Sequence, residues 1–204
     1  MEKRIITAAL TGNWGDKTTN PAMPMTPEEI AEAAYECWKE GAAVVHIHMR
    51  DEEGHPTMRV DLFEKTIKRI REKCDVIINM TSSGGHSLDG MASDETRMLP
   101  FRTLKPEMGS FDCGTLNWLH QTIFENSPKF LEQLGHLMQE VGCKPEPEIF
   151  DVGMVDTAKY YLKTGVLKAP CHFQLVCRAA AIIREAGYEV ATPAEAREIL
   201  GIRK

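Results

Sequence analysis

Short apolar runs alternate with amphipathic stretches along most of this 204-residue chain. The runs predict β-strands, because they are brief and rich in β-branched residues, whereas the stretches between them repeat apolar positions with a helical period. Strands are predicted at Arg4–Thr11, Ala43–His48, Asp75–Met80, Glu107–Cys113 and Glu146–Phe150, and helices at Thr26–Gly41, Asp61–Lys73 and Phe130–Val141. Strands and helices that alternate over short connections predict an α/β fold with a parallel sheet.

The order of these elements favours one barrel-type domain over residues 1–204. No GxGxxG motif follows the first strand, which favours a TIM (β/α)8-barrel over a doubly wound nucleotide-binding sheet. The sixth strand, at Phe173–Val176, runs without a loop into a predicted helix over Leu175–Ile183, and the chain is shorter than the ~250 residues of a typical closed barrel. We therefore expect an incomplete barrel of about six strands, with an internal deletion near residues 174–177.

The second predicted strand ends in two histidines, His46 and His48. Successive side chains of a strand point to opposite faces, so these two imidazoles share a face at the carboxyl end of the strand, where barrels carry their chemistry. Neutral imidazole is a preferred ligand of zinc-class ions. The pair therefore predicts a metal site, although strand-end histidines can also face water or make a core hydrogen bond.

Polar residues also follow the neighbouring predicted strands. Candidate substrate-binding residues are Ser82, Ser83, Gly84 and Gly85 after the third strand, Ser110 and Asp112 on one face of the fourth, and Glu148 in the fifth. The Ser82–Gly85 segment is either a simple turn or a nest of backbone amides for a carboxylate or phosphate. Because the carboxyl ends of the strands meet at one mouth of a barrel, we expect these groups to converge.

Other chemistry-bearing residues receive less weight. Glu146, between Pro145 and Pro147, is expected to be a solvated strand start. The histidines expected to be structural or solvent-exposed are His55, His86, His120, His136 and His172. The six cysteines include no CxxC pair, so buried reduced thiols are expected, with Cys113 alone near the predicted mouth.

Charge and hydropathy argue against several function classes. The formal net charge is −6 and acidic residues are spread along the sequence, so no basic face is predicted for nucleic acid. The apolar run Ile5–Leu10 is too short for a secretory signal, and no run approaches membrane-spanning length. We expect a cytoplasmic protein that binds neither nucleic acid nor membranes.

Several sequence blocks together resemble one enzyme family. The blocks are Thr7–Gly12, Met25–Ile30, Val45–Asp51, Leu104–Met108, Gly114–Asn117 and Gly153–Asp156. In this order they resemble the β-keto acid cleavage enzymes, whose best-known members cleave 3-keto-5-aminohexanoate. The resemblance covers nearly the whole chain. It implies a zinc TIM barrel that converts a β-keto acid and acetyl-CoA, the co-substrate, into acetoacetate and a new acyl-CoA.

The resemblance also implies roles for the candidate residues. His46 and His48 match the family's zinc histidines, and the positions that match substrate-contacting groups are Ser82, Ser110, Asp112 and Glu148, with Ser82–Gly85 aligned on the carboxylate-binding loop. Members carry an acidic residue in the first loop for the far end of the substrate, where Trp14 stands in this chain, with Asp16 nearby. This difference leaves the identity of the β-keto acid open. The family further implies a homo-oligomer.

The last part of the chain departs from the family pattern. Members continue from a sixth strand that resembles Ala169–Gln174 through two further strands, and the last ends in Arg-x-Gly-x-Glu-Asp. The Glu of that pattern is the third zinc ligand and the Asp is the catalytic base. This sequence lacks the pattern, and its remaining residues resemble the family's C-terminal helices, the last of which starts at Thr192–Glu195. A segment after about residue 175 is therefore expected to be missing.

Three hypotheses about function remain open. The chain is an active zinc-dependent β-keto acid cleavage enzyme if Glu148, Asp112 or His86 replaces the missing ligand. It is a catalytically inactive, truncated member with a structural or regulatory role if none does. A metal hydrolase of the amidohydrolase type is the third hypothesis, although those barrels usually place the His-x-His pair on the first strand.

Overall fold

The computed structural model describes residues 3–87, 90–118, 120–175 and 189–202 of the chain. Its centre is an open sheet of six parallel strands in the order β13-β12-β9-β6-β3-β2. These strands are β2 (Thr7–Ala9), β3 (Val44–Ile47), β6 (Ile77–Met80), β9 (Met108–Asp112), β12 (Lys144–Ile149) and β13 (Gln174–Leu175). The predicted α/β fold and the incomplete six-stranded barrel are confirmed.

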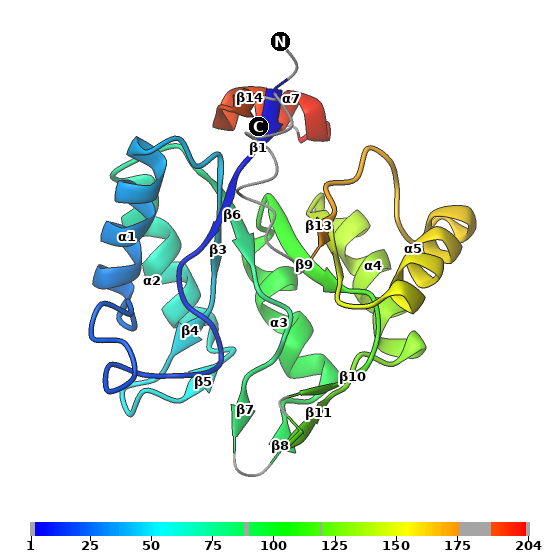
Figure 1. Cartoon of the computed structure of the whole chain (residues 1–204), viewed down its shortest axis with the longest axis horizontal. Helices are drawn as coiled ribbons and strands as arrows, with labels where there is room; N and C mark the ends of the chain where they lie inside the picture. The colour runs from blue at the N-terminus through cyan, green and yellow to red at the C-terminus, as the bar shows by residue number, and fades with distance from the viewer. Residues whose placement is uncertain (1–2, 88–89, 119, 176–188, 203–204) are drawn as a thin grey trace.

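The sheet is curled, as Figure 1 shows. Thr7, on the edge strand β2, donates a hydrogen bond of 3.4 Å from Oγ1 to Glu146 Oε1 on β12, which lies near the other edge. Such a contact requires that the two sides of the sheet approach each other across its concave face. That concave face corresponds to the interior of a barrel, where side chains from alternate positions of each strand meet.

Within the described residues, five helices pack beside the sheet: α1 (Pro27–Lys39), α2 (Val60–Arg71), α3 (Asp94–Leu104), α4 (Pro128–Val141) and α5 (Val152–Thr164). Their apolar faces share one core with Val45 and Ile47 of β3, which point away from the two histidines. The helices therefore cover the outer face and leave the concave face to polar side chains. Among the described residues, no helix combines the length and the apolar character needed to cross a membrane.

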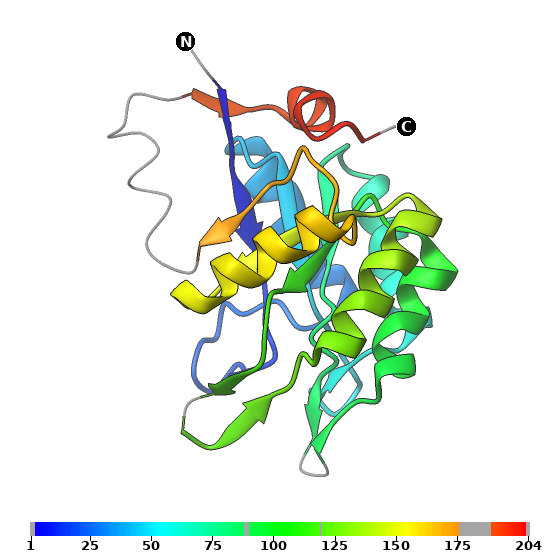
Figure 2. The same cartoon turned by 90° about the vertical axis from the view of Figure 1, so that its right-hand side faces the viewer.

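The amino-terminal end of the sheet, which we call the closed end, is covered by the last described part of the chain. β1 (Lys3–Ile5) pairs in parallel with β14 (Glu189–Ala191), and α7 (Pro193–Leu200) follows. Figures 1 and 2 show these elements together beyond the same end of the sheet. A small apolar cluster joins them to the strands, and Arg197 of α7 donates hydrogen bonds of 2.6 Å to Glu107 Oε1 and to Asp75 O.

The opposite end carries short hairpins between strand and helix. β4 (Met49–Arg50) pairs with β5 (Pro56–Thr57), β7 (His86–Ser87) with β8 (Gly90–Met91), and β10 (Leu116–Trp118) with β11 (Thr122–Phe124). They extend the carboxyl ends of the strands, at the lower edge of Figure 1. We call this end the site end, because it holds the cavity described below.

Local sequence signals explain several element boundaries. Thr26 caps α1 through its side chain, and Glu29 closes the predicted capping box. The predicted first strand is split at Ile6 into β1 and β2. α3 and α5 were not predicted. The helix predicted over Leu175–Ile183 lies, after Leu175, outside the described residues.

Two prolines within β12 explain how that strand is paired. Backbone bonds run from Lys144 N to Glu107 O and from Cys113 N to Glu148 O, so even-numbered residues of β12 pair with β9. In a parallel strand the alternate residues face the other neighbour, so the missing N–H groups of Pro145 and Pro147 face the β13 side. β13 pairs only from Glu148 onward in the described part of the chain, so no ladder bond is lost.

Candidate active site at the site end

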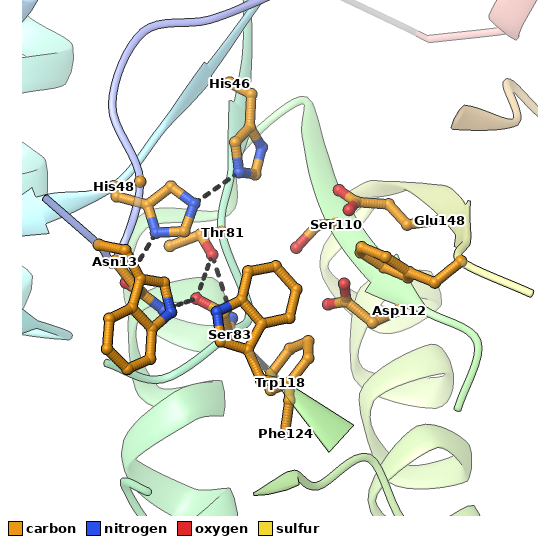
Figure 3. Close-up of a pocket in the computed structure, with 13 residues that line it drawn as sticks. Asn13, His46, His48, Thr81, Ser83, Ser110, Asp112, Trp118, Phe124 and Glu148 are labelled. Carbon is orange, nitrogen blue, oxygen red and sulfur yellow. Dashed lines mark hydrogen bonds between the residues drawn. The ribbon is translucent and has the colours of Figure 1, made fainter. Parts of the chain in front are cut away.

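A cavity of about 280 Å³ opens at the carboxyl ends of the central strands (Figure 3). Among the polar side chains that line it are His46, His48, Thr81, Ser83, Ser110, Asp112 and Glu148. The structure therefore brings six of the nine sequence-predicted site residues to one cavity. Ser82, Gly84 and Gly85 lie in the loop that adjoins it.

The two histidines converge within this cavity. Their Nε2 atoms are 2.9 Å apart, and His48 donates a 2.9 Å hydrogen bond from Nδ1 to Asn13 Oδ1. That bond places the His48 proton on Nδ1 and leaves a lone pair on Nε2. Burial lowers the pKa of both rings, that of His46 to about 4, so both are neutral near pH 7. Neutral, converging imidazoles are the form that binds a metal ion.

The spacing of the two nitrogens fits one shared ion. Zinc–nitrogen distances are ~2.0–2.1 Å, so two nitrogens 2.9 Å apart can both reach one ion at an angle of about 90°. His46 Nδ1 and Asn79 Oδ1 are buried without a hydrogen-bond partner among the described residues, and the two residues are opposite in the β3–β6 register. A His46 ring that binds metal through Nε2 carries its proton on Nδ1, beside Asn79. The donor set therefore fits a zinc-class ion.

The expectation that Glu146 is a solvated strand start is wrong. Its side chain is fully buried, because the curl of the sheet encloses the inward face of β12. Glu146 Oε2 accepts a hydrogen bond from Asn79 Nδ2, and Oε1 accepts one from Thr7 and lies 3.3 Å from His172 Nε2. Burial raises the pKa of Glu146 to about 7, although the bonds from Asn79 and Thr7 oppose the shift. His172, expected to be structural or solvent-exposed, thus lies beside a buried carboxyl group.

Asp112 and Glu148 form a pair of buried carboxyl groups on neighbouring strands. They are opposite in the β9–β12 register and are 4% and 8% exposed. Burial raises the pKa of Asp112 to about 6, and burial together with the Asp112 charge raises that of Glu148 well above its usual range. Two such neighbours share a proton near neutral pH, because both cannot ionise cheaply in this setting.

Ligand atoms of three buried or partly buried side chains also cluster beside this pair. One atom each of His46, Glu146 and Glu148 lie within 4.8 Å of one another. Asp112 Oδ2 has no hydrogen-bond partner among the described residues. His86, another candidate for a replacement ligand, has a side chain outside the described part of the structure. Burial raises the pKa of Cys113 to about 12, so this residue stays a thiol.

The Ser82–Gly85 loop needs its two glycines. Gly84 and Gly85 have φ values of +86° and +66°, and a Cβ on Gly85 would lie 2.8 Å from Pro56 O. The amides of Ser82 and Ser83 already donate hydrogen bonds to Ser110 Oγ and Thr81 Oγ1. An anion at this loop would therefore be bound by hydroxyl groups and by the glycine half of the loop rather than by these two amides.

Arg97 supports this loop from behind and was missed by the sequence analysis. Its side chain is 1% exposed, and Nε donates a 2.7 Å hydrogen bond to Ser82 O while Nη2 donates one of 2.6 Å to Asn126 Oδ1. The guanidinium also lies 3.7 Å from the centre of the Phe130 ring. Burial lowers the pKa of Arg97 to about 10, which still leaves it charged at pH 7. A lone arginine in an unpredicted helix gives no sequence signal.

Aromatic side chains form another wall of the cavity. Trp118 meets the rings of Phe124 and Phe150 edge to face, each at 6.3 Å between ring centres. Trp14 lines the same cavity from the loop after β2. Of these aromatic residues, only Trp14 was identified from the sequence as part of a candidate site. Phe150, like Asn13 and Thr81, lies shortly after a strand of the central sheet, and that position could have identified it, whereas Trp118 and Phe124 belong to the unpredicted hairpin β10–β11.

Comparisons with known proteins agree on one family. A family model described as beta-keto acid cleavage enzyme matches residues 3–178. The 3-keto-5-aminohexanoate cleavage enzyme of Fusobacterium nucleatum is 44% identical over 176 residues, which are 86% of this chain and 63% of that protein. The 3-dehydrocarnitine:acetyl-CoA trimethylamine transferase of Rhizobium meliloti is 35% identical over 83% of this chain and 63% of that protein. This chain thus spans less than two thirds of the length of these relatives.

A solved structure shows the same fold. The apo structure of ObcA superposes with a TM-score of 0.64 over 75% of this chain and 36% of that chain, at 22% sequence identity. At this identity the likeness concerns the fold alone. The barrel-type architecture deduced from the curled sheet therefore has an experimentally solved counterpart.

Proposed function

Because the chain belongs to the β-keto acid cleavage enzyme family, we propose that it is a zinc-dependent enzyme acting on a β-keto acid and acetyl-CoA. It would transfer an acyl unit between them to give acetoacetate and a new acyl-CoA. The observation that carries this proposal is the pair of neutral imidazoles whose Nε2 atoms converge at 2.9 Å in the cavity. Relatives named as acetyl-CoA transferases support acetyl-CoA as the co-substrate.

The metal and the substrate carboxylate have separate places in this proposal. His46 and His48 hold Zn²⁺, which when bound polarises a substrate carbonyl as a Lewis acid. Ser82, Ser83, Gly84 and Gly85 bind the substrate carboxylate, with the charge of Arg97 behind the loop favouring an anion there. Asn13 links the two places, because it accepts from His48 and donates to Ser83 Oγ at 2.8 Å.

Asp112 is the proposed proton acceptor. It lines the cavity, its Oδ2 is buried and without a partner among the described residues, and its pKa of about 6 suits a general base near neutral pH. Ser110 and Glu148 flank the same region and complete the proposed substrate contacts. Deprotonation of the substrate beside its keto group would precede attack on the acetyl thioester.

Product analysis tests this function directly. The zinc-loaded protein is incubated with acetyl-CoA and a panel of β-keto acids with amino, carboxylate or alkyl far ends, and acyl-CoA products are identified by mass spectrometry. We expect a new acyl-CoA together with acetoacetate for at least one acid, and none with the His46→Ala/His48→Ala variant. No product from any acid, with zinc fully bound, would contradict the proposal.

A catalytically inactive family member is the second candidate function. It is favoured by one sequence observation, the absence of the Arg-x-Gly-x-Glu-Asp pattern. An inactive member would show no turnover with any acid in the same panel while keeping a folded chain. The two candidates therefore separate in one assay.

We further propose a cytoplasmic homo-oligomer. Helix α5 supports association, because Val152, Val155 and Tyr160 expose apolar side chains, to 88%, 37% and 54%. Light scattering after size-exclusion chromatography measures the mass directly. A Val152→Asp/Val155→Asp variant is expected to shift an oligomer toward the monomer, and a monomeric wild type would contradict this proposal.

A further inference from the structure

We propose that Glu146 and Glu148 of β12 supply the carboxylate ligands of the ion that His46 and His48 bind. This inference rests on the proposed function and adds the oxygen ligands of the same site. It concerns two carboxylates from one strand: Glu146, which was expected to be solvated, and Glu148, which would bind the ion in place of the direct substrate contact proposed above. The ion would thus be held by β3, by the residue that follows it and by β12.

The curl of the sheet brings the two strands into position. His46 lies in β3 and His48 directly follows its end, while β12 presents Glu146 and Glu148, in both cases at positions two residues apart. In Figure 3 the histidines and Glu148 come from opposite walls of the cavity. One ligand atom each of His46, Glu146 and Glu148 already lie within 4.8 Å of one another. Two ligands of one zinc ion lie at most ~4.2 Å apart, so the most distant of these atoms would approach one another by several tenths of an ångström on binding.

The proposed site lies in a buried, acidic part of the concave face. Asp112 lies opposite Glu148 in the β9–β12 register, and its Oδ2 has no hydrogen-bond partner among the described residues, so its charge adds to that of the proposed ligands. Three carboxyl groups, those of Asp112, Glu146 and Glu148, are each less than a tenth exposed on adjoining strands. Buried carboxylates cost free energy unless they are paired or bind a metal. A divalent ion beside His46 would provide that compensation.

Glu146 is supported as metal-bound carboxylates usually are. Asn79 and Thr7 donate hydrogen bonds to its two oxygens, and His172 lies 3.3 Å from Oε1. Such outer partners orient a ligand and increase its affinity for metal. Asn79 is also opposite His46 in the strand register, so one residue adjoins both proposed ligands.

Zinc titration of purified variants tests the ligand set. Chelator-treated wild type, Glu146→Gln, Glu148→Gln, the double variant, Asp112→Asn and His46→Ala are titrated with Zn²⁺ against a chromogenic chelator, and bound zinc is counted by elemental analysis. We expect each single Gln variant to bind zinc ~10–100-fold more weakly, and the double variant to lose more. Asp112→Asn removes a buried charge from the same wall without removing a ligand, so it should bind within about threefold of wild type.

The outcomes separate this inference from the proposed function. Wild-type affinity in the folded double variant, with zinc lost from His46→Ala, overturns the carboxylate ligands and leaves the zinc enzyme intact. No zinc in the wild type overturns both. Because the variants can fold poorly, X-ray absorption at the zinc edge of the wild-type protein gives an independent measurement. Two imidazoles with oxygen ligands are expected, and a third imidazole or a sulfur ligand would overturn the inference.

Discussion

Within the described part of the chain, buried polar groups are paired at the closed end of the sheet, whereas some of those at the site end are not. At the closed end the Arg197 guanidinium donates to Glu107 and to Asp75 O, so its charge and hydrogen bonds are matched within the chain. At the site end Asp112 and Glu146 are buried with raised pKa values, and Asp112 Oδ2 has no partner in the described structure. Unmatched polar groups are costly, so they mark the end that a ligand completes.

The largest expected effect breaks the chemistry at the site end without weakening the fold. Asp112→Asn removes the proposed proton acceptor and should lower turnover by ~10²–10⁴-fold. The free energy of unfolding should stay the same or rise, because a buried carboxyl with a raised pKa is removed. Steady-state product formation and urea unfolding measure the two quantities. Unchanged turnover would exclude Asp112 as the base.

The corresponding change at the closed end should do the reverse. Arg197→Met leaves Asp75 O and part of Glu107 without a donor, and should lower the free energy of unfolding by about 2–3 kcal/mol. This expected loss is smaller than that for breaking a fully buried ion pair, because Glu107 keeps its ion pair with Arg71. Arg69→Met, which loses an exposed pair with Glu28, should cost less than about 1 kcal/mol in the same urea experiment. Equal losses of unfolding free energy in the two variants would show that the buried Arg197 contacts stabilise the fold no more than an exposed ion pair.

The pH dependence of metal-free stability sharpens the contrast. The folded-state pKa values of Asp112 and Glu146, about 6 and about 7, lie above the ~4 of unfolded carboxyl groups. The folded chain therefore binds more protons than the unfolded chain in that window, so this stability is present below about pH 4 and is lost as pH rises toward 7. At about 1.4 kcal/mol for each pKa unit, the two shifts together predict a loss on the order of 6 kcal/mol in chelator.

Urea unfolding of wild type and Glu146→Gln at matched pH values measures this contribution. Exposed carboxylates contribute equally to both proteins, so the difference between the two curves isolates the buried group. As the pH rises toward 7, we expect Glu146→Gln to lose less unfolding free energy than the wild type. Parallel curves would show that Glu146 does not titrate in this range.

The smallest effect concerns the loop at the site end. Gly85→Ala should lower the free energy of unfolding by about 1–2 kcal/mol, because alanine strains at positive φ and its Cβ would lie 2.8 Å from Pro56 O. Gly142→Ala has a similar φ of +75° with no atom within 4 Å, so it isolates the strain from the close contact. A larger cost at Gly142 would contradict the role of the contact.

The sequence predicted elements whose signals are local. The capping box at Thr26 and the alternation that places His46 and His48 on one face need no tertiary information. α3 was missed because Pro100 lies inside it, which normally argues against a helix. α5 was missed because its apolar residues do not form one stripe, and Val152 is 88% exposed.

The candidate site could be predicted only in part for a related reason. Its strand-end residues follow from the general architecture of barrels, but the burial of Glu146 depends on the curl that places Thr7 against it. The flanking prolines indicated a solvated strand start, because proline is rare inside sheets. The two prolines lack N–H donors on the side of β12 that faces β13. Only the observed pairing shows that β13, in the described residues, does not reach this part of β12, so no hydrogen bond is lost.

These prolines also affect how copies of this chain can associate. An uncovered strand edge offers a row of N–H and C=O groups that can template pairing with another molecule and start aggregation. Beside Pro145 and Pro147, β12 has no N–H groups to offer on that side. This stretch of β12 is therefore protected against intermolecular strand addition both by its missing donors and by the burial of the two prolines.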